Sequence, residues 1–101
     1  MEVKITRQDA VTTVFFSGRL DTPATPEVAK AVEPVLEQAS GSIILDCREM
    51  SYISSSGLRI FLSIRKAAAS QGGSVTVRGM NRDIRNVFMM TGFLNLFKIE
   101  E

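Results

Sequence analysis

A buried strand followed closely by a cluster of serines constrains the fold of this chain more than any other feature. Residues 42–46 predict a buried strand, and residues 57–70 carry a helical pattern of apolar side chains. Residues 47–52 lie between them and are expected to form a loop. Residues 54–56, all serine, therefore fall at the N-terminus of the helix. Serine is a favoured cap there, and the free N–H groups tolerate a phosphate.

The N-terminal part of the chain predicts a β-hairpin. Residues 3–7 alternate apolar and polar side chains, and residues 11–16 are β-branched and aromatic. Gln8 and Asp9 are turn-forming residues between these two runs. Gly18 is expected to end the second strand.

The first helix is expected to begin with Thr25 as its cap and Pro26 at its first position. An apolar face runs from Val28 to Ala39. Pro34 lies in the middle of this segment, where a proline removes a hydrogen bond and costs about 3 kcal/mol. We therefore expect the helix to be kinked or split there.

The second half of the chain alternates helices and strands. Residues 74–78 alternate as a strand, Asn81 caps a helix that Gly92 ends, and residues 98–99 add a short last strand. This alternation predicts an α/β fold with a partly parallel sheet and right-handed crossovers. We expect one domain over residues 1–101, with a mixed four- to five-stranded sheet and three to four helices.

The helix over residues 57–70 is apolar around most of its circumference. Its polar side chains form one narrow stripe, made up of Arg59, Ser63, Lys66 and Ser70. Two interpretations are open. Neighbouring helices cover the excess apolar surface, or the first turn contributes to a docking surface.

Composition narrows the classes of function. The 101 residues are 45% hydrophobic, which fits one core, and the net charge of +1 gives no electrostatic footprint for nucleic acid. We expect a protein partner instead. Cys47 is a single cysteine and the N-terminus does not resemble a signal peptide, so a reducing cytoplasm is the expected location. No apolar run reaches the roughly 20 residues that a membrane span needs, and we expect no membrane insertion.

The residue types that are missing argue against catalysis. The chain has no histidine, so it cannot form a Ser-His-Asp or Cys-His nucleophile, and a zinc site would need one thiol and carboxylates. It has neither a phosphate-binding loop of the Gly-x-x-x-x-Gly-Lys type nor a dinucleotide-binding glycine pattern. We expect no enzyme activity, no cofactor and no metal. Cys47 is expected to be a small buried apolar residue and not a reactive thiol.

The serine cluster also carries a resemblance to a known family. Ser54, Ser55, Ser56, Gly57 and Leu58 match four of the five positions of the Asp-Ser-Ser-Gly-Leu signature. Residues 17–21 look like the early Gly-x-Leu-Asp turn of the same family. Residues 91–97 resemble its C-terminal end. In order and spacing, the chain thus resembles STAS-domain anti-sigma factor antagonists. It departs from them at Ser54, where the family usually has an acid.

The resemblance implies a single STAS domain that works as a phosphorylation-switched binding module. Its expected partner is an anti-sigma factor Ser/Thr kinase, which supplies the ATP; the unphosphorylated domain sequesters this kinase and so releases a sigma factor. The implied phosphoacceptor is Ser56, with Ser55 and then Ser54 next. The implied partner-binding residues are Asp21, Ser54, Ser55, Gly57, Leu58 and Arg59, and the domain is expected to be a monomer.

Other interpretations of the same residues remain open. The serines can simply end a loop and cap a helix, with no switch. The domain can also be a STAS subunit of a stress-sensing scaffold or of a lipid ABC transporter, where it packs permanently. Asp21 and Asp46 are the acids that the resemblance places near the serines, where either would compensate for the missing acid at Ser54.

Overall fold

The predicted hairpin is formed by β1 (Glu2–Gln8) and β2 (Val11–Leu20) in the computed structural model, which describes residues 1–100. The strands are antiparallel, and the turn between them uses Asp9 at a positive φ of 56°. Gly18 was predicted to end β2, and this prediction was wrong. Gly18 has a φ of 100° and lies at an irregularity in the pairing of β2 with the next strand, after which β2 continues to Leu20. A glycine tolerates this bulge because it lacks a Cβ.

Pro34 divides the first helical segment, as predicted. Helix α1 (Thr25–Ala31) is followed by the short α2 (Glu33–Glu37), with Pro34 in the first turn of α2, where a missing N–H costs nothing. The predicted side-chain cap is not formed. Thr25 is the first residue of α1, and its hydroxyl donates to the carbonyl oxygen of Asp21 at 3.0 Å.

The third strand is much longer than predicted. Strand β3 (Ser42–Ile53) includes the whole segment 47–52 that we expected to be a loop. The sequence pattern of this segment does not indicate a strand, because its buried residues do not alternate with exposed ones. Cys47, Met50 and Ile53 are buried at every third position, and β2 pairs with this part of β3 through two register shifts that disturb the regular alternation.

The remaining elements follow the predicted order. They are α3 (Ser55–Gln71), β4 (Ser74–Arg78), α4 (Arg82–Met90), a 3₁₀ turn, η1 (Phe93–Asn95), and β5 (Lys98–Glu100). Helix α3 begins two residues earlier than predicted, and η1 was not predicted. Asn81 caps α4 by accepting from the N–H of Ile84 at 2.8 Å, and Gly92 follows α4 with a φ of 80°. Within residues 1–100 the sheet order is β1-β2-β3-β4-β5, parallel except for the hairpin.

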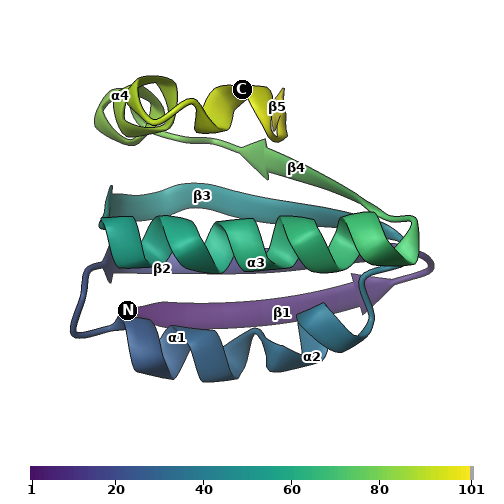
Figure 1. Cartoon of the computed structure of the whole chain (residues 1–101). Helices are drawn as coiled ribbons and strands as arrows, with labels where there is room; N and C mark the ends of the chain where they lie inside the picture. The colour runs from purple at the N-terminus through teal and green to yellow at the C-terminus, as the bar shows by residue number, and fades with distance from the viewer. Residues whose placement is uncertain (101) are drawn as a thin grey trace.

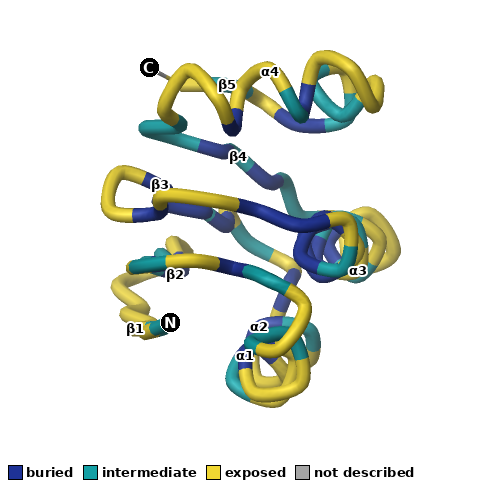
Figure 2. Tube along the Cα trace, turned by 90° about the vertical axis from the view of Figure 1, so that its left-hand side faces the viewer, coloured by how far each residue is buried: buried dark blue, intermediate teal, exposed yellow. Residues whose placement is uncertain are grey.

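The helices α1, α2 and α3 lie on one face of the sheet (Figure 1). The core lies between them and the sheet, and Figure 2 shows the most buried stretches of β2, β3 and α3 there. Phe61 of α3 is at its centre, with its ring centroid 5.1 Å from Phe16 and 5.8 Å from Phe88. Contacts with α1 and α2 cover much of the wide apolar surface of α3, which favours the first of the two interpretations given above. Within residues 1–100, no helix is long and apolar enough to cross a membrane.

Candidate functional site

The three serines lie at the junction of β3 and α3, as predicted, and their surroundings differ. Ser54 is the N-cap of α3, in an extended conformation, and its hydroxyl accepts from the N–H of Gly57 at 3.1 Å. Its own N–H donates to the carbonyl oxygen of Leu20 at 2.9 Å, which ties the junction to the end of β2. Ser54 is only 9% exposed. It is therefore the structural serine of the cluster.

Ser55 and Ser56 are the serines that remain available for chemistry. They occupy the first two positions of α3, where Ser55 is exposed and Ser56 is half-buried. Neither hydroxyl has a hydrogen-bond partner within the part of the chain that the structure describes. The first turn of α3 itself contains no acidic side chain, so the positive end of the helix dipole would favour a negative charge added at these hydroxyls.

Gly57 and Leu58 contribute to the junction from inside. A Cβ on Gly57 would lie 2.7 Å from Cγ of Leu20 and 2.9 Å from Cγ1 of Ile53, so only glycine lets α3 approach the ends of β2 and β3 this closely. Leu58 is 5% exposed and packs in the core. Arg59 is exposed on the first turn of α3. Of these predicted partner-binding residues, Arg59 thus offers a surface, whereas Gly57 and Leu58 position that surface.

Asp21 is the acid that the fold brings beside the serines. It follows Leu20, whose carbonyl oxygen accepts the hydrogen bond from the N–H of Ser54. Asp21 itself is half-buried. One carboxylate oxygen accepts from the N–H of Ala24 at 3.1 Å, and the other lies 3.8 Å from Nε of Arg19. Asp21 therefore shapes the loop before α1 and also adds a negative charge to the site.

Asp46 was expected near the serines, and this expectation was wrong. Because β3 continues to Ile53, Asp46 is separated from Ser54 by about 25 Å of extended strand. It is 3% exposed and pairs with Arg48 at 2.7 Å and Arg78 at 3.5 Å. Burial raises the pKa of Asp46, but the hydrogen bonds from Arg48 and the charges of both arginines outweigh it and hold the pKa below its usual value. Asp46 thus carries a structural charge.

Cys47 is fully buried, as expected. Burial and the neighbouring charge of Asp46 raise the pKa of its thiol to about 12. At neutral pH the reactive thiolate is therefore almost absent. Cys47 belongs to the core and has no part in the site.

Arg19 and Tyr52 are surface residues of the site that sequence reasoning missed. They are directly opposite each other in the pairing of β2 with β3, just before Leu20 and Ile53. The guanidinium carbon of Arg19 lies 4.4 Å from the centroid of the Tyr52 ring, and Tyr52 is 41% exposed. The sequence offered one signal, an aromatic residue two positions before the serines. Its partner became visible only when the segment expected to be a loop formed a strand.

The fold and the junction together define a small α/β module whose candidate site is an exposed surface at the start of a helix. The sequence pattern of the STAS domain matches residues 2–101, and the chain belongs to the STAS domain family. This confirms the family that the residues resemble and its α/β architecture.

Several known proteins are similar to this chain in sequence or in structure. The chain is 26% identical over 101 residues to an anti-sigma-B factor antagonist of Staphylococcus aureus. The aligned region covers 100% of this chain and 94% of the relative. An anti-sigma factor antagonist from Mycobacterium paratuberculosis has a similar structure, with a TM-score of 0.83, 21% identity, and coverage of 98% of this chain and 84% of that one. The Bacillus cell fate determinant SpoIIAA in its phosphorylated form has a TM-score of 0.74 at 16% identity, covering 97% and 90%.

Proposed function

We propose that this domain is an anti-sigma factor antagonist that works as a phosphorylation-switched binding module in the cytoplasm. In its unphosphorylated form it docks on an anti-sigma factor Ser/Thr kinase, and this docking releases a sigma factor. The kinase supplies the ATP, and the domain itself performs no catalysis. Its similarity over the whole chain to an anti-sigma-B factor antagonist supports this assignment.

The main support for a phosphorylation switch is that the cap of α3 and the candidate acceptors are different serines. Ser54 occupies the N-cap hydrogen bond, which leaves the hydroxyls of Ser55 and Ser56 unengaged at the helix N-terminus. A phosphate adds about −1.5 to −2 charges, which the positive end of a helix tolerates. Phosphorylation therefore leaves the fold intact and acts on the surface that the partner contacts.

The different exposure of the two residues decides the order in which we propose them as acceptors. The family resemblance predicts Ser56 first and Ser55 second. A kinase must reach the hydroxyl, and Ser55 is exposed whereas Ser56 is half-buried. We therefore place Ser55 first and keep Ser56 as the second acceptor.

The proposed docking surface is built from Asp21, Ser55 and Arg59, together with Arg19 and Tyr52. It combines both signs of charge with an aromatic ring, a composition that suits a protein partner. A phosphate introduced at its centre must be desolvated when the partner binds. A loss of about 3 to 4 kcal/mol would weaken binding roughly 150- to 900-fold, enough to release the partner.

The test is phosphorylation by the cognate kinase with ATP, followed by site mapping by mass spectrometry. We expect one phosphate per chain, which the variant Ser55→Ala loses and Ser56→Ala keeps. Loss in Ser56→Ala alone would move the acceptor to Ser56 without changing the switch. Binding of the kinase without any phosphorylation of the three serines would reject the switch and favour a permanently packed subunit of a scaffold or a lipid transporter.

A further inference from the structure

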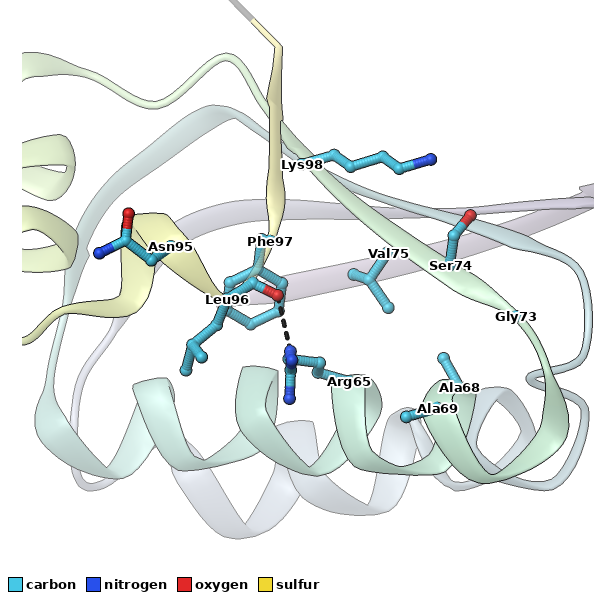
Figure 3. Close-up of a pocket in the computed structure, with 10 residues that line it drawn as sticks. All are labelled: Arg65, Ala68, Ala69, Gly73, Ser74, Val75, Asn95, Leu96, Phe97 and Lys98. Carbon is cyan, nitrogen blue, oxygen red and sulfur yellow. Dashed lines mark hydrogen bonds between the residues drawn. The ribbon is translucent and has the colours of Figure 1, made fainter.

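Helix α3 carries two arginines, and they differ in what their side chains contact. Nε of Arg65 donates to the carbonyl oxygen of Leu96 at 2.6 Å, the bond drawn as a dashed line in Figure 3. This bond holds Arg65 against the segment that joins η1 to β5. Arg59 is exposed, and within residues 1–100 its guanidinium has no hydrogen bond, ion pair or ring contact. Arg59 is therefore the arginine of α3 that is free to bind another group.

Arg59 lies one helical turn after the two candidate acceptors. It is four residues after Ser55 and three residues after Ser56, and α3 is helical from Ser55 onward. Side chains at both spacings are neighbours on a helix, with Cβ atoms about 5 to 6 Å apart. The long side chain of arginine spans this separation, so its guanidinium can reach a phosphate on either serine.

No acid of the fold already occupies Arg59. Helix α3 contains no acidic residue. The acid beside the serines, Asp21, has other partners: one carboxylate oxygen accepts from the N–H of Ala24 at 3.1 Å, and the other lies 3.8 Å from Nε of Arg19. A phosphate on Ser55 would therefore be the first anionic group of α3 within one turn of Arg59.

We propose that Arg59 binds the phosphate within the same helix once Ser55 or Ser56 is phosphorylated, a pairing that rests on the proposed phosphorylation switch. The phosphate adds about −1.5 to −2 charges, and an arginine fork bonds two of its oxygens at once. In the unphosphorylated domain, the same guanidinium is available to an acidic group of the kinase. Phosphorylation thus withdraws a cation from the docking surface while it adds an anion.

The first experiment needs no kinase. Phosphoserine is incorporated at position 55 during translation, and ³¹P chemical shifts followed against pH give the second pKa of the phosphate, ordinarily about 6. Because a neighbouring positive charge favours the ionised form, this pKa should be lower in the parent than in Arg59→Gln, by at least about 0.3 pH unit. Arg59→Lys keeps the charge and should retain at least about half of this difference.

Lys66→Gln is the matched control. It removes one positive charge from an exposed position of α3, about 16 Å along the helix axis from the phosphoserine, and should move the phosphate pKa by less than about 0.1 pH unit. The charged and titratable side chains at the ends of β2 and β3, which are Arg19, Asp21 and Tyr52, are the same in all of these proteins. Glutamine and lysine are good helix formers, so the variants should fold.

Two results would overturn the pairing. One is an equal phosphate pKa in the parent and in Arg59→Gln, and the other is a change in Lys66→Gln as large as that in Arg59→Gln. Loss of the whole difference in Arg59→Lys would likewise show that the charge of residue 59 does not act on the phosphate.

A second experiment tests the withdrawal of Arg59 by calorimetric titration of the purified kinase domain. Arg59→Gln should weaken binding of the unphosphorylated domain at least about fivefold, and should change binding of the phosphorylated domain by less than about twofold. Equal losses in both forms would show that Arg59 stays available to the partner. A kinase that neither binds nor phosphorylates the domain would reject the proposed function, whereas the phosphate pKa would still decide the pairing.

Discussion

At the scale of single residues, the serine cluster divides two tasks between neighbouring side chains. Ser54 closes the helix end, and the hydroxyls of Ser55 and Ser56 stay unengaged. Ser54 thus supplies the helix cap at the position where the Asp-Ser-Ser-Gly-Leu signature has an acid. A serine satisfies the N–H of Gly57 as well as an aspartate does, because both are favoured N-caps.

Replacing Ser54 should therefore affect stability more than replacing its neighbour. We expect Ser54→Ala to lower the free energy of unfolding by about 0.5 to 2 kcal/mol, since the N–H of Gly57 loses its acceptor at a buried position. Ser55→Ala is the matched control and should stay within about 0.5 kcal/mol of the parent. Urea unfolding midpoints measure both. Equal midpoints for the two variants would contradict the assignment of the cap.

Asp46 should make stability depend on pH. Its folded-state pKa is lowered from the ordinary value of 3.8, so its contribution is fully present above that value and is lost as the pH falls through the folded-state pKa. We expect Asp46→Asn to lower the free energy of unfolding by about 1 to 3 kcal/mol at pH 7. The difference from the parent should shrink below about pH 4.

Urea titrations of both proteins at pH 7 and near pH 2.5 measure this difference. Glu49→Gln removes a nearby exposed charge and should change stability by less than about 0.5 kcal/mol at either pH. A difference for Asp46→Asn that is the same at both pH values would show that packing, and not the ion pairs with Arg48 and Arg78, determines its effect.

At the scale of elements, the junction of β3 and α3 depends on close approach. Helix α3 begins directly after β3, with Gly57 against side chains from the ends of two strands. This packing fixes where the first turn of α3, and with it Ser55 and Arg59, meets the solvent. The contact of Gly57 with the core thus determines the position of the surface that Ser55 and Arg59 form.

Gly57→Val should therefore destabilise the protein although valine is a better helix former than glycine. The added side chain must displace Leu20 and Ile53, and overpacking of this kind costs about 1 to 3 kcal/mol. Thermal and urea unfolding measure the loss, with Lys66→Val as the control in the same helix, outside the core. A Gly57→Val protein as stable as the parent would show that the junction is looser than the distances indicate.

At the scale of the whole molecule, folding and partner binding should separate. A negative charge at the start of α3 is favourable by about 0.3 to 1 kcal/mol, so Ser55→Asp should unfold no earlier than the parent. The same charge lies in the proposed docking surface, where we expect it to weaken binding of the kinase at least tenfold. Ser55→Ala should still bind.

Calorimetric titration of the purified kinase domain and thermal melts of the same samples measure both quantities. Enzymatically phosphorylated protein is the reference, because a carboxylate carries less charge than a phosphate. Equal affinities for phosphorylated protein and Ser55→Ala would favour a permanently packed subunit. A lower melting temperature for Ser55→Asp would instead place its effect in the fold.

The sequence by itself determined the order of the elements, the hairpin, the division of the first helix at Pro34 and the place of the serines at a helix start. Each of these follows from local chemistry: side-chain alternation, the ring of proline and the preference of serine for helix ends. Contacts between distant residues left no such local pattern. These include the extension of β3 to Ile53, the pairing of Asp46 with Arg78, and Arg19 against Tyr52.

Tertiary structure decided these features because they depend on which strand lies beside which. Residues 47–53 have too irregular a pattern to form a strand alone, and their pairing with the bulged end of β2 makes them one. That pairing moves Asp46 away from the serines and brings Arg19 to Tyr52. It also leaves Ser54 buried and Ser55 exposed, a distinction that three identical side chains in a row cannot carry in the sequence.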